Sequence, residues 1–376
     1  MKGYHAIPKW LPALLLGLFL VSTTAGCSSG VHATTWTDLV VHEGVVYAAD
    51  LTQVRALDAQ TGQPIWNYPA EGSAGPFYTV TLLPGERLFV TSQERSGGLF
   101  TARTRPVIRA LSLEGLETGW PQPFTGAQGD FVASGVVADD ILVIGNGDGN
   151  VYALDVTNGS SAWPQPFHTQ GRVWASPLIL SDTVYIASLD HNLYALDLQT
   201  GAERWRFTAS GAVASRPLAL NGTLYFGAFD YRLYAVDLTT HETRWTFQGE
   251  NWFWGTPATD GDTIYAADVD GNIYALDSET GLLRWTQKVE QIVRLGPQLS
   301  SDGQVLLIGG NGGAIYALSA ADGTPLWSRA GGGQIAAMVV AGDIVYVSRI
   351  LANEHVQAFY TINGRELWTY PQPQAQ

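Results

Sequence analysis

The chain has 376 residues with a formal net charge of −14 at pH 7, and only 14% of its residues are charged. This low charge, together with 42 glycines and 13 tryptophans, excludes an intrinsically disordered chain and makes a helical coiled coil a poor fit. The acidic excess disfavours binding to nucleic acid or to anionic lipid headgroups, because both would repel such a surface.

The N-terminal segment has the features of a secretory signal. Lys2 and Lys9 flank the start of an apolar run over residues 11–21, which is too short to span a bilayer as a helix. Residues 24–27, Thr-Ala-Gly-Cys, resemble the lipobox of bacterial lipoproteins, in which the cysteine is acylated. The resemblance implies lipidation of Cys27; the alternative is an ordinary signal peptide, cut near Gly26, that leaves a free thiol.

Location and domain organisation follow from this segment. Two or more acyl chains hold a protein stably at a membrane surface. Serines at 28 and 29, by resemblance to lipoproteins of cells with two membranes, favour the periplasmic face of the outer membrane. In a cell with one membrane, the outer face of the cytoplasmic membrane is expected. The expected parts are a signal peptide at 1–26, a short tether at 27–36, a repeat domain at 37–370 and a tail at 371–376.

A repeat with a period of about 40 residues covers most of the chain. Eight alanines are each followed ten residues later by a tryptophan, and six of the eight also have a glycine six residues on, with Leu116 and His241 as the exceptions. Within each repeat, short segments with a period of two are separated by Gly, Asn and Asp, which predicts four short strands. The tryptophans of the repeat are Trp66, Trp120, Trp163, Trp205, Trp245, Trp285, Trp327 and Trp368.

Eight repeats of four strands predict an all-β protein, an eight-bladed β-propeller of 32 strands. The signatures of WD40 repeats are missing from the chain. Trp36 lies only nine residues before Val45, which is closer than any repeat tryptophan lies to the matching strand of the next repeat. We therefore expect eight self-contained blades, with no strand exchanged between the first and the last.

The segment A-L-D-x-x-T-G-x-x-x-W, found at residues 56–66, 195–205 and 275–285, resembles the tryptophan-docking motif of the PQQ-like (quinoprotein-type) repeat family. The resemblance implies that each motif tryptophan packs between blades, on the alanine and on the peptide near the glycine. Glycine suits this turn because it adopts a positive φ without strain. We therefore assign the eight motif tryptophans to the structure.

The same family includes dehydrogenases that hold pyrroloquinoline quinone (PQQ) over the propeller axis, so a PQQ-dependent enzyme is the alternative function. Those enzymes carry a pair of adjacent cysteines, whereas Cys27 is the only cysteine of this chain. We therefore expect a protein that is not an enzyme and that binds no PQQ or other cofactor.

No metal site is expected either. Asp268, Asp270 and Asn272 have the spacing of a cation-binding loop, but Ile273 stands where an EF-hand loop requires glycine. We interpret the segment as a tight hairpin turn. The histidines are scattered over different repeats and form no catalytic or metal-ligand pattern.

A binding surface is expected on the propeller face that carries the connections between successive blades. Aromatic and arginine residues, which are enriched at interaction hot spots, gather in these connections. They are Phe77, Tyr78, Phe131, Arg172, Trp174, Arg216, Trp252, Phe253, Trp254 and Arg294. The one substantial insertion, between Gln93 and Pro106, should reach the same face and adds Arg95, Arg103 and Arg105. The alternative is a solvated loop without a role.

In its length, lipobox and repeats the chain also resembles the BamB type of outer-membrane assembly factor, whose propeller lacks PQQ and binds a protein partner. The resemblance implies a lipid-anchored binding or scaffolding protein with a protein partner in the cell envelope. Outer-membrane protein assembly is the specific role it suggests.

Overall fold

The computed structural model describes residues 38–71, 76–96, 103–353 and 355–372, without the side chains of Arg95, Ser96 and Arg103. Cys27, Trp36 and the expected signal peptide and tether lie outside these residues. The described part contains 31 strands and no helix, and therefore no helix that could cross a membrane.

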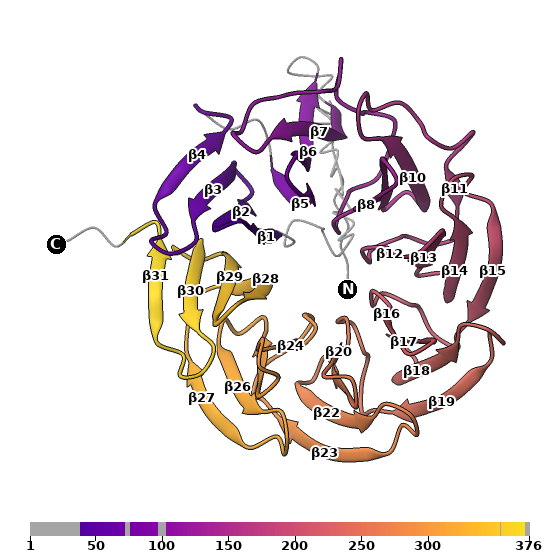
Figure 1. Cartoon of the computed structure of the whole chain (residues 1–376), viewed down its shortest axis with the longest axis vertical. Helices are drawn as coiled ribbons and strands as arrows, with labels where there is room; N and C mark the ends of the chain where they lie inside the picture. The colour runs from indigo at the N-terminus through magenta and orange to yellow at the C-terminus, as the bar shows by residue number, and fades with distance from the viewer. Residues whose placement is uncertain (1–37, 72–75, 97–102, 354, 373–376) are drawn as a thin grey trace, which may run out of the picture. The chain divides into compact units, whose positions relative to one another are not determined.

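The strands form eight antiparallel sheets, each built from consecutive segments, which succeed one another around a ring (Figure 1). The first two sheets contain β1 (Leu39–His42), β2 (Val45–Ala49), β3 (Val54–Asp58) and β4 (Pro64–Tyr68), then β5 (Phe77–Leu83), β6 (Arg87–Ser96) and β7 (Arg103–Ser112). The next two contain β8 (Val136–Ala138), β9 (Ile141–Gly145), β10 (Asn150–Asp155) and β11 (Phe167–His168), then β12 (Leu178–Leu180), β13 (Thr183–Ala187), β14 (Asn192–Asp197) and β15 (Glu203–Thr208). The fifth and sixth contain β16 (Leu218–Leu220), β17 (Thr223–Gly227), β18 (Arg232–Asp237) and β19 (Thr243–Gln248), then β20 (Ala258–Thr259), β21 (Thr263–Ala267), β22 (Asn272–Asp277) and β23 (Leu283–Lys288). The last two contain β24 (Gln298–Leu299), β25 (Val305–Gly309), β26 (Ile315–Ser319) and β27 (Pro325–Arg329), then β28 (Gln334–Ala341), β29 (Ile344–Ile350), β30 (Val356–Tyr360) and β31 (Glu366–Tyr370). The predicted eight-bladed all-β propeller is confirmed.

The ring closes between the first and the last blade without exchange of a strand. The first sheet uses only β1 to β4 and the last only β28 to β31. Across this seam the Tyr346 hydroxyl donates to the Ala59 carbonyl at 3.1 Å, and Trp368 Nε1 donates to the same carbonyl at 2.9 Å. Leu39, Val46 and Val356 belong to the apolar cluster that fills the seam. The last blade is therefore joined to the first by side-chain packing and hydrogen bonds.

The second blade departs from the predicted four strands and contains three. In place of an outer strand, the segment around Trp120 forms only isolated bridges, Ile108 with Phe124 and Leu111 with Glu117. The outer segments of the second and third blades both read Trp-Pro-Gln-Pro-Phe, at residues 120–124 and 163–167. Proline has no N–H to donate to a ladder, so the third blade keeps only the two-residue β11 and the second has no outer strand.

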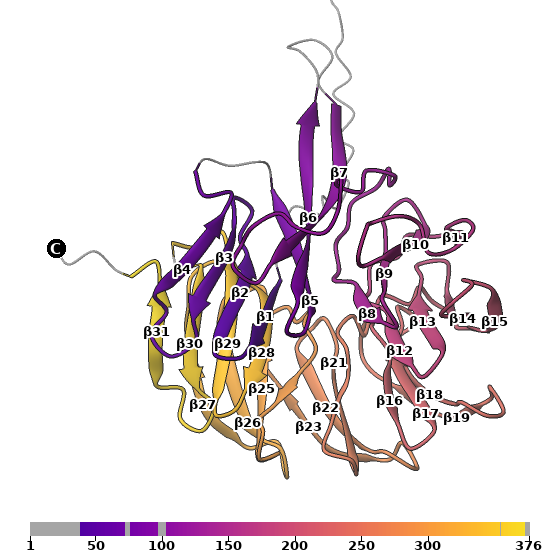
Figure 2. The same ribbon diagram turned by 45° about the horizontal axis from the view of Figure 1, so that its top comes forward.

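The insertion between Gln93 and Pro106 extends a hairpin where a loop was expected. β6 and β7 each have ten residues and remain paired as far as Ser96 and Arg103. Figure 2 shows this hairpin projecting beyond the strands of the neighbouring blades. The prediction of a loop was therefore wrong for the described part of the insertion.

The motif tryptophans lie between successive blades. Seven of the eight donate Nε1–H to a carbonyl of the next blade, over 2.8 to 3.1 Å. Each of these seven rings also lies on a glycine of that blade with positive φ, where an added Cβ would come within 2.5 or 2.6 Å of ring carbon. In the second blade this glycine is Gly115, one residue earlier than the repeat predicts.

Trp205 is the exception among the motif tryptophans. The next blade has His241 in place of glycine, and His241 adopts a φ of 62°. The two rings stack with their centroids 4.2 Å apart and their planes at 18°. An aromatic contact therefore replaces the close approach of ring and glycine at this one blade boundary.

We expect Gly201→Ala to destabilise the protein more than Gly44→Ala. Both glycines have a similar φ, +71° and +77°, so both substitutions add the strain of the left-handed region, about 1 to 2 kcal/mol. Only at Gly201 would the new Cβ meet a docked ring, that of Trp163 at 2.5 Å, which adds an overpacking cost of about 1 to 3 kcal/mol. Urea unfolding of both variants measures the difference. Equal losses of stability would contradict the docking role of the glycine.

A buried carboxylate also joins the first and last blades. Asp50, 6% exposed, accepts hydrogen bonds from Thr52 Oγ1 at 2.6 Å and from His355 Nδ1 at 3.2 Å and pairs with Arg55. Arg55 in turn donates to the Tyr370 hydroxyl of the last blade at 3.0 Å. Burial by itself would raise the pKa of Asp50, but the bonds from His355, Thr52 and Arg55 hold it well below its usual range.

We expect Asp50→Asn to lower the free energy of unfolding at pH 7 by about 1 to 3 kcal/mol, because it weakens charged hydrogen bonds at a buried seam. The folded-state pKa lies below the unfolded value of about 3.9, so the contribution of the ionised group is complete above that value. It shrinks as the pH falls through the folded-state pKa. The difference in the free energy of unfolding between the two proteins should therefore narrow as the pH is lowered from 4 to 2. A constant difference over this range would contradict the prediction.

Candidate functional site

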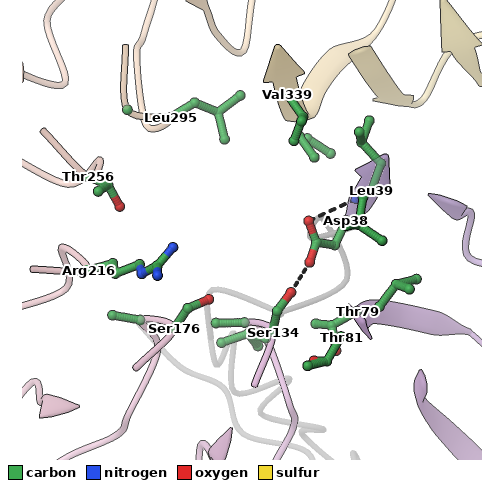
Figure 3. A pocket seen from close by; sticks show the side chains of 18 of the residues that line it. Asp38, Leu39, Thr79, Thr81, Ser134, Ser176, Arg216, Thr256, Leu295 and Val339 are labelled. Atoms are coloured by element: carbon green, nitrogen blue, oxygen red, sulfur yellow. Dashed lines mark hydrogen bonds between the residues drawn. The ribbon is translucent and has the colours of Figure 1, made fainter. Parts of the chain in front are cut away.

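A cavity of about 600 Å³ lies at the centre of the ring and is lined by residues of all eight blades. Its lining comes from the innermost strands and from the segments that lead into them. Figure 3 shows Asp38 of the first blade, Ser134 of the third and Arg216 of the fifth around the same space. Residues that are far apart in the sequence therefore share one site.

The backbone before the innermost strands explains which side chains line the cavity. Ser176, Arg216 and Thr256 occupy equivalent positions in three successive repeats, each directly before a proline, and all three line the cavity. A residue before proline is restricted to extended backbone. In these three blades the repeat thus places the side chain before the proline at the wall of the cavity.

Asp38 lies at the wall of this cavity beside the first strand. Its carboxylate accepts a hydrogen bond from the Leu39 N–H at 2.8 Å and another from the Ser134 hydroxyl, which joins the first blade to the third (Figure 3). Enclosure by the protein raises the pKa of Asp38 to about 7, against the opposing effects of the backbone hydrogen bonds and of Arg216. Asp38 therefore changes its charge near neutral pH.

Arg216 directs its guanidinium into the cavity, toward the side on which Asp38 lies (Figure 3). The side chain is accessible from the cavity, but the surrounding walls enclose it and lower its pKa, while the charge of Asp38 acts in the opposite direction. Among the described residues, no hydrogen bond or ion pair holds this guanidinium. It is a positive group free to meet a ligand.

Aromatic rings and two arginines form a cluster that borders the cavity. Trp174 and Trp254 stack with centroids 6.2 Å apart and planes at 21°, and Phe229 lies 5.0 Å from Trp254 and 4.9 Å from Trp252. Arg172 lies 5.5 Å over Trp174, and Arg294 lies 5.2 Å over Trp254. We call these six residues the aromatic cluster.

The stacking across three blades depends on a small residue between the two tryptophans. The fourth, fifth and sixth repeats each have a proline at the same position, Pro177, Pro217 and Pro257. Three residues before these prolines stand Trp174, Ala214 and Trp254. Because the fifth blade has alanine at this position, the two indoles on either side reach each other. The same position in the seventh repeat holds Arg294, which covers Trp254.

The structure brings together several residues that the sequence singled out. Arg172, Trp174, Trp252, Trp254 and Arg294 lie in the aromatic cluster, and Arg216 lies in the cavity. Sequence reasoning missed Phe229, which lies in the turn between β17 and β18. Phe229 could have been found from the topology, because the turn between the second and third strands of a blade lies on the same face as the inter-blade connections.

Other predicted contact residues are not available on the surface. Phe77 is fully buried between the first two blades, edge-on to Tyr68 at 5.9 Å, and Phe131 and Phe253 are each 1% exposed. Tyr78 is 3% exposed and lines the cavity, where burial raises its pKa to about 12. These four rings pack inside the propeller because the connection turns inward where its innermost strand begins.

The arginines of the insertion lie on the second blade, apart in sequence from the aromatic cluster. Arg105 is half exposed and lies 3.6 Å from Glu94, which also pairs with Arg109. The side chains of Arg95 and Arg103 lie outside the described part of the structure. Arg105 is thus partly neutralised by a carboxylate on the paired strand.

The acidic turn at Asp268 has a structural role. Its carboxylate accepts the N–H groups of Asp270 and Asn272, both at 3.0 Å, and the Tyr274 hydroxyl at 2.9 Å. It closes the hairpin between β21 and β22. Across residues 38–71, 76–96, 103–353 and 355–372, no three His, Cys, Asp or Glu side chains gather in a way that could hold a metal ion.

Solved structures of other proteins share this architecture. No curated protein sequence matches the chain. The crystal structure of BamB from Moraxella catarrhalis is similar at a TM-score of 0.67 with 19% identity, over 83% of this chain and 92% of that one. A computationally designed protein, Ika8, is similar at 0.72 with 15% identity, over 88% of this chain and 97% of that one. Identities this low support the fold alone, but a family model covers nearly all of the propeller, matching residues 24–188, 147–292 and 269–376. The chain belongs to the family described as outer membrane protein assembly factor BamB.

Proposed function

We propose that the protein is a non-enzymatic scaffold of the cell envelope that binds a protein partner, with outer-membrane protein assembly as its role. Membership of the BamB family supports the assembly role. The aromatic cluster is the single structural observation that carries partner binding, because stacked aromatic rings with arginines are the side chains most enriched at hot spots. Within this proposal Cys27 is the site of the lipid anchor.

The geometry of the aromatic cluster suits a binding surface. Trp252, at one end of the aromatic cluster, is 41% exposed although its side chain is large and apolar. The stacked rings are held by one another and by Arg172 and Arg294, so little side-chain entropy remains to be lost on binding. In a chain with a net charge of −14, two arginines at this place favour a partner that presents carboxylates next to apolar side chains.

We expect Trp252→Ala to weaken partner binding by about 2 kcal/mol or more, the usual cost at a hot spot. Leu282→Ala is the matched control, since Leu282 is also apolar and exposed (68%) but lies in the turn between β22 and β23. Arg172→Glu should reduce binding as well, whereas Arg244→Glu on the outer strand β19 should not.

The measurement is affinity capture from detergent-solubilised envelopes of the source cell, followed by titration of the captured component with each variant. The proposal requires an outer-membrane assembly component that the Trp252→Ala and Arg172→Glu variants lose. A capture without such a component, or equal capture by all variants, would contradict it.

PQQ-dependent oxidation is the competing function, and the chemistry of the chain argues against it. The chain has a single cysteine and therefore lacks the adjacent cysteine pair of the quinoprotein dehydrogenases. We expect the purified protein, given PQQ and calcium, to show neither a red-shifted absorbance nor dye-coupled oxidation of alcohols or sugars. Turnover under these conditions would replace the scaffold proposal with an enzyme.

A further inference from the structure

The axial cavity differs in charge from the rest of the molecule. The chain carries a net charge of −14, yet the charged side chains that the described residues bring to the cavity lining are Arg216, Arg294 and Asp38. Tyr78, the remaining titratable group of the lining, is neutral at physiological pH because burial raises its pKa to about 12. The cavity thus has a net charge of +1 when Asp38 is ionised, which favours an anion.

The two arginines of the lining are not equivalent. Arg294 lies over the ring of Trp254 and is held by the aromatic cluster. Arg216 has no hydrogen bond or ion pair to any residue of the described ranges, and its guanidinium points into the cavity (Figure 3). A guanidinium presents N–H donors in a planar fork that matches the two oxygens of a carboxylate. Because no described side chain pairs with it, this guanidinium can bind a carboxylate without first giving up another contact.

The remaining lining indicates the body of the ligand. Leu39, Leu295 and Val339 supply apolar surface, and the hydroxyls of Ser176 and Thr256 lie around the axis with Arg216 (Figure 3). A volume of about 600 Å³ is within the range of small-molecule pockets. The apolar part of the lining suits an anion with an aliphatic body better than inorganic phosphate, which has none. We propose that the axial cavity binds a small monocarboxylate with an aliphatic body, and that Arg216 recognises its carboxylate.

Asp38 makes this binding depend on pH. Its carboxylate lies in the same lining as Arg216, and its pKa is raised to about 7 by enclosure. Above that pH the ionised Asp38 repels a bound anion, and below it the neutral acid does not. Tyr78 stays neutral between pH 6 and 8 because burial raises its pKa, and arginine side chains remain protonated over this range. Affinity for the carboxylate should therefore rise as the pH falls from 8 to 6.

The test uses hexanoate as the probe, titrated by calorimetry into the full chain in detergent at pH 6 and pH 8. Hexanoate should bind saturably with a Kd of about 1 mM or tighter, which is within reach of a ligand of this size. Hexanamide, which has the same body without the charge, should bind at least tenfold more weakly, and inorganic phosphate should not compete. These comparisons use the unmodified protein and do not depend on the folding of a variant.

Single substitutions then test whether Arg216 contacts the carboxylate of hexanoate. Arg216→Gln should weaken hexanoate binding about ten- to a hundredfold, the usual loss for hydrogen bonds to a charged group. Arg244→Gln is the matched control, because Arg244 lies on the outer strand β19 and should leave the affinity unchanged. Asp38→Asn should bind equally at pH 6 and pH 8, since asparagine keeps a hydrogen-bond acceptor for Ser134 but does not titrate.

Three results would overturn the proposal: no saturable binding of hexanoate, equal binding of hexanoate and hexanamide, or an unchanged affinity in folded Arg216→Gln. Competition by phosphate would assign the cavity to inorganic anions instead. If Asp38→Asn still binds hexanoate more tightly at pH 6 than at pH 8, Asp38 is not the group that causes the pH dependence.

Discussion

The docking of an outer-strand tryptophan on the next blade is the contact on which the whole ring depends. A single repeat cannot bury its apolar faces alone and gains its core only by packing against its neighbours. Seven of the eight motif indoles donate Nε1–H to a carbonyl of the neighbour and lie on a glycine, and the eighth, Trp205, stacks on His241 instead. Repeated around the ring, this contact packs each blade against the next.

The central cavity is a consequence of that packing. Because the blades are held by their outer strands, the innermost strands converge without filling the axis, and their side chains line a shared space. Asp38 of the first blade and Ser134 of the third are 96 residues apart in the chain and are hydrogen-bonded at the wall of this space. The ring therefore creates one axial site lined by all eight blades, and the side chains that line it differ from blade to blade.

Sequence reasoning succeeded where a repeated residue has one structural reason. The spacing of alanine, glycine and tryptophan predicted eight blades because docking requires all three together. It failed where the repeat varies: two prolines remove the outer strand of the second blade, and Gly115 docks Trp66 from one residue earlier than expected. Phe77 was expected at the binding surface because it is aromatic. It is buried instead, because burial depends on which way the backbone turns at β5.

The sequence by itself determined the number of blades, the residues that join them and the absence of the paired cysteines of a quinoprotein dehydrogenase, because these follow from local periodicity and composition. Only the tertiary structure decided that Trp174 and Trp254 stack across the small Ala214, and that Arg216 faces Asp38 over the axis. Such pairings join blades that are not neighbours, or not consecutive in the chain. No local pattern encodes them, since they depend on the curvature with which the whole ring closes.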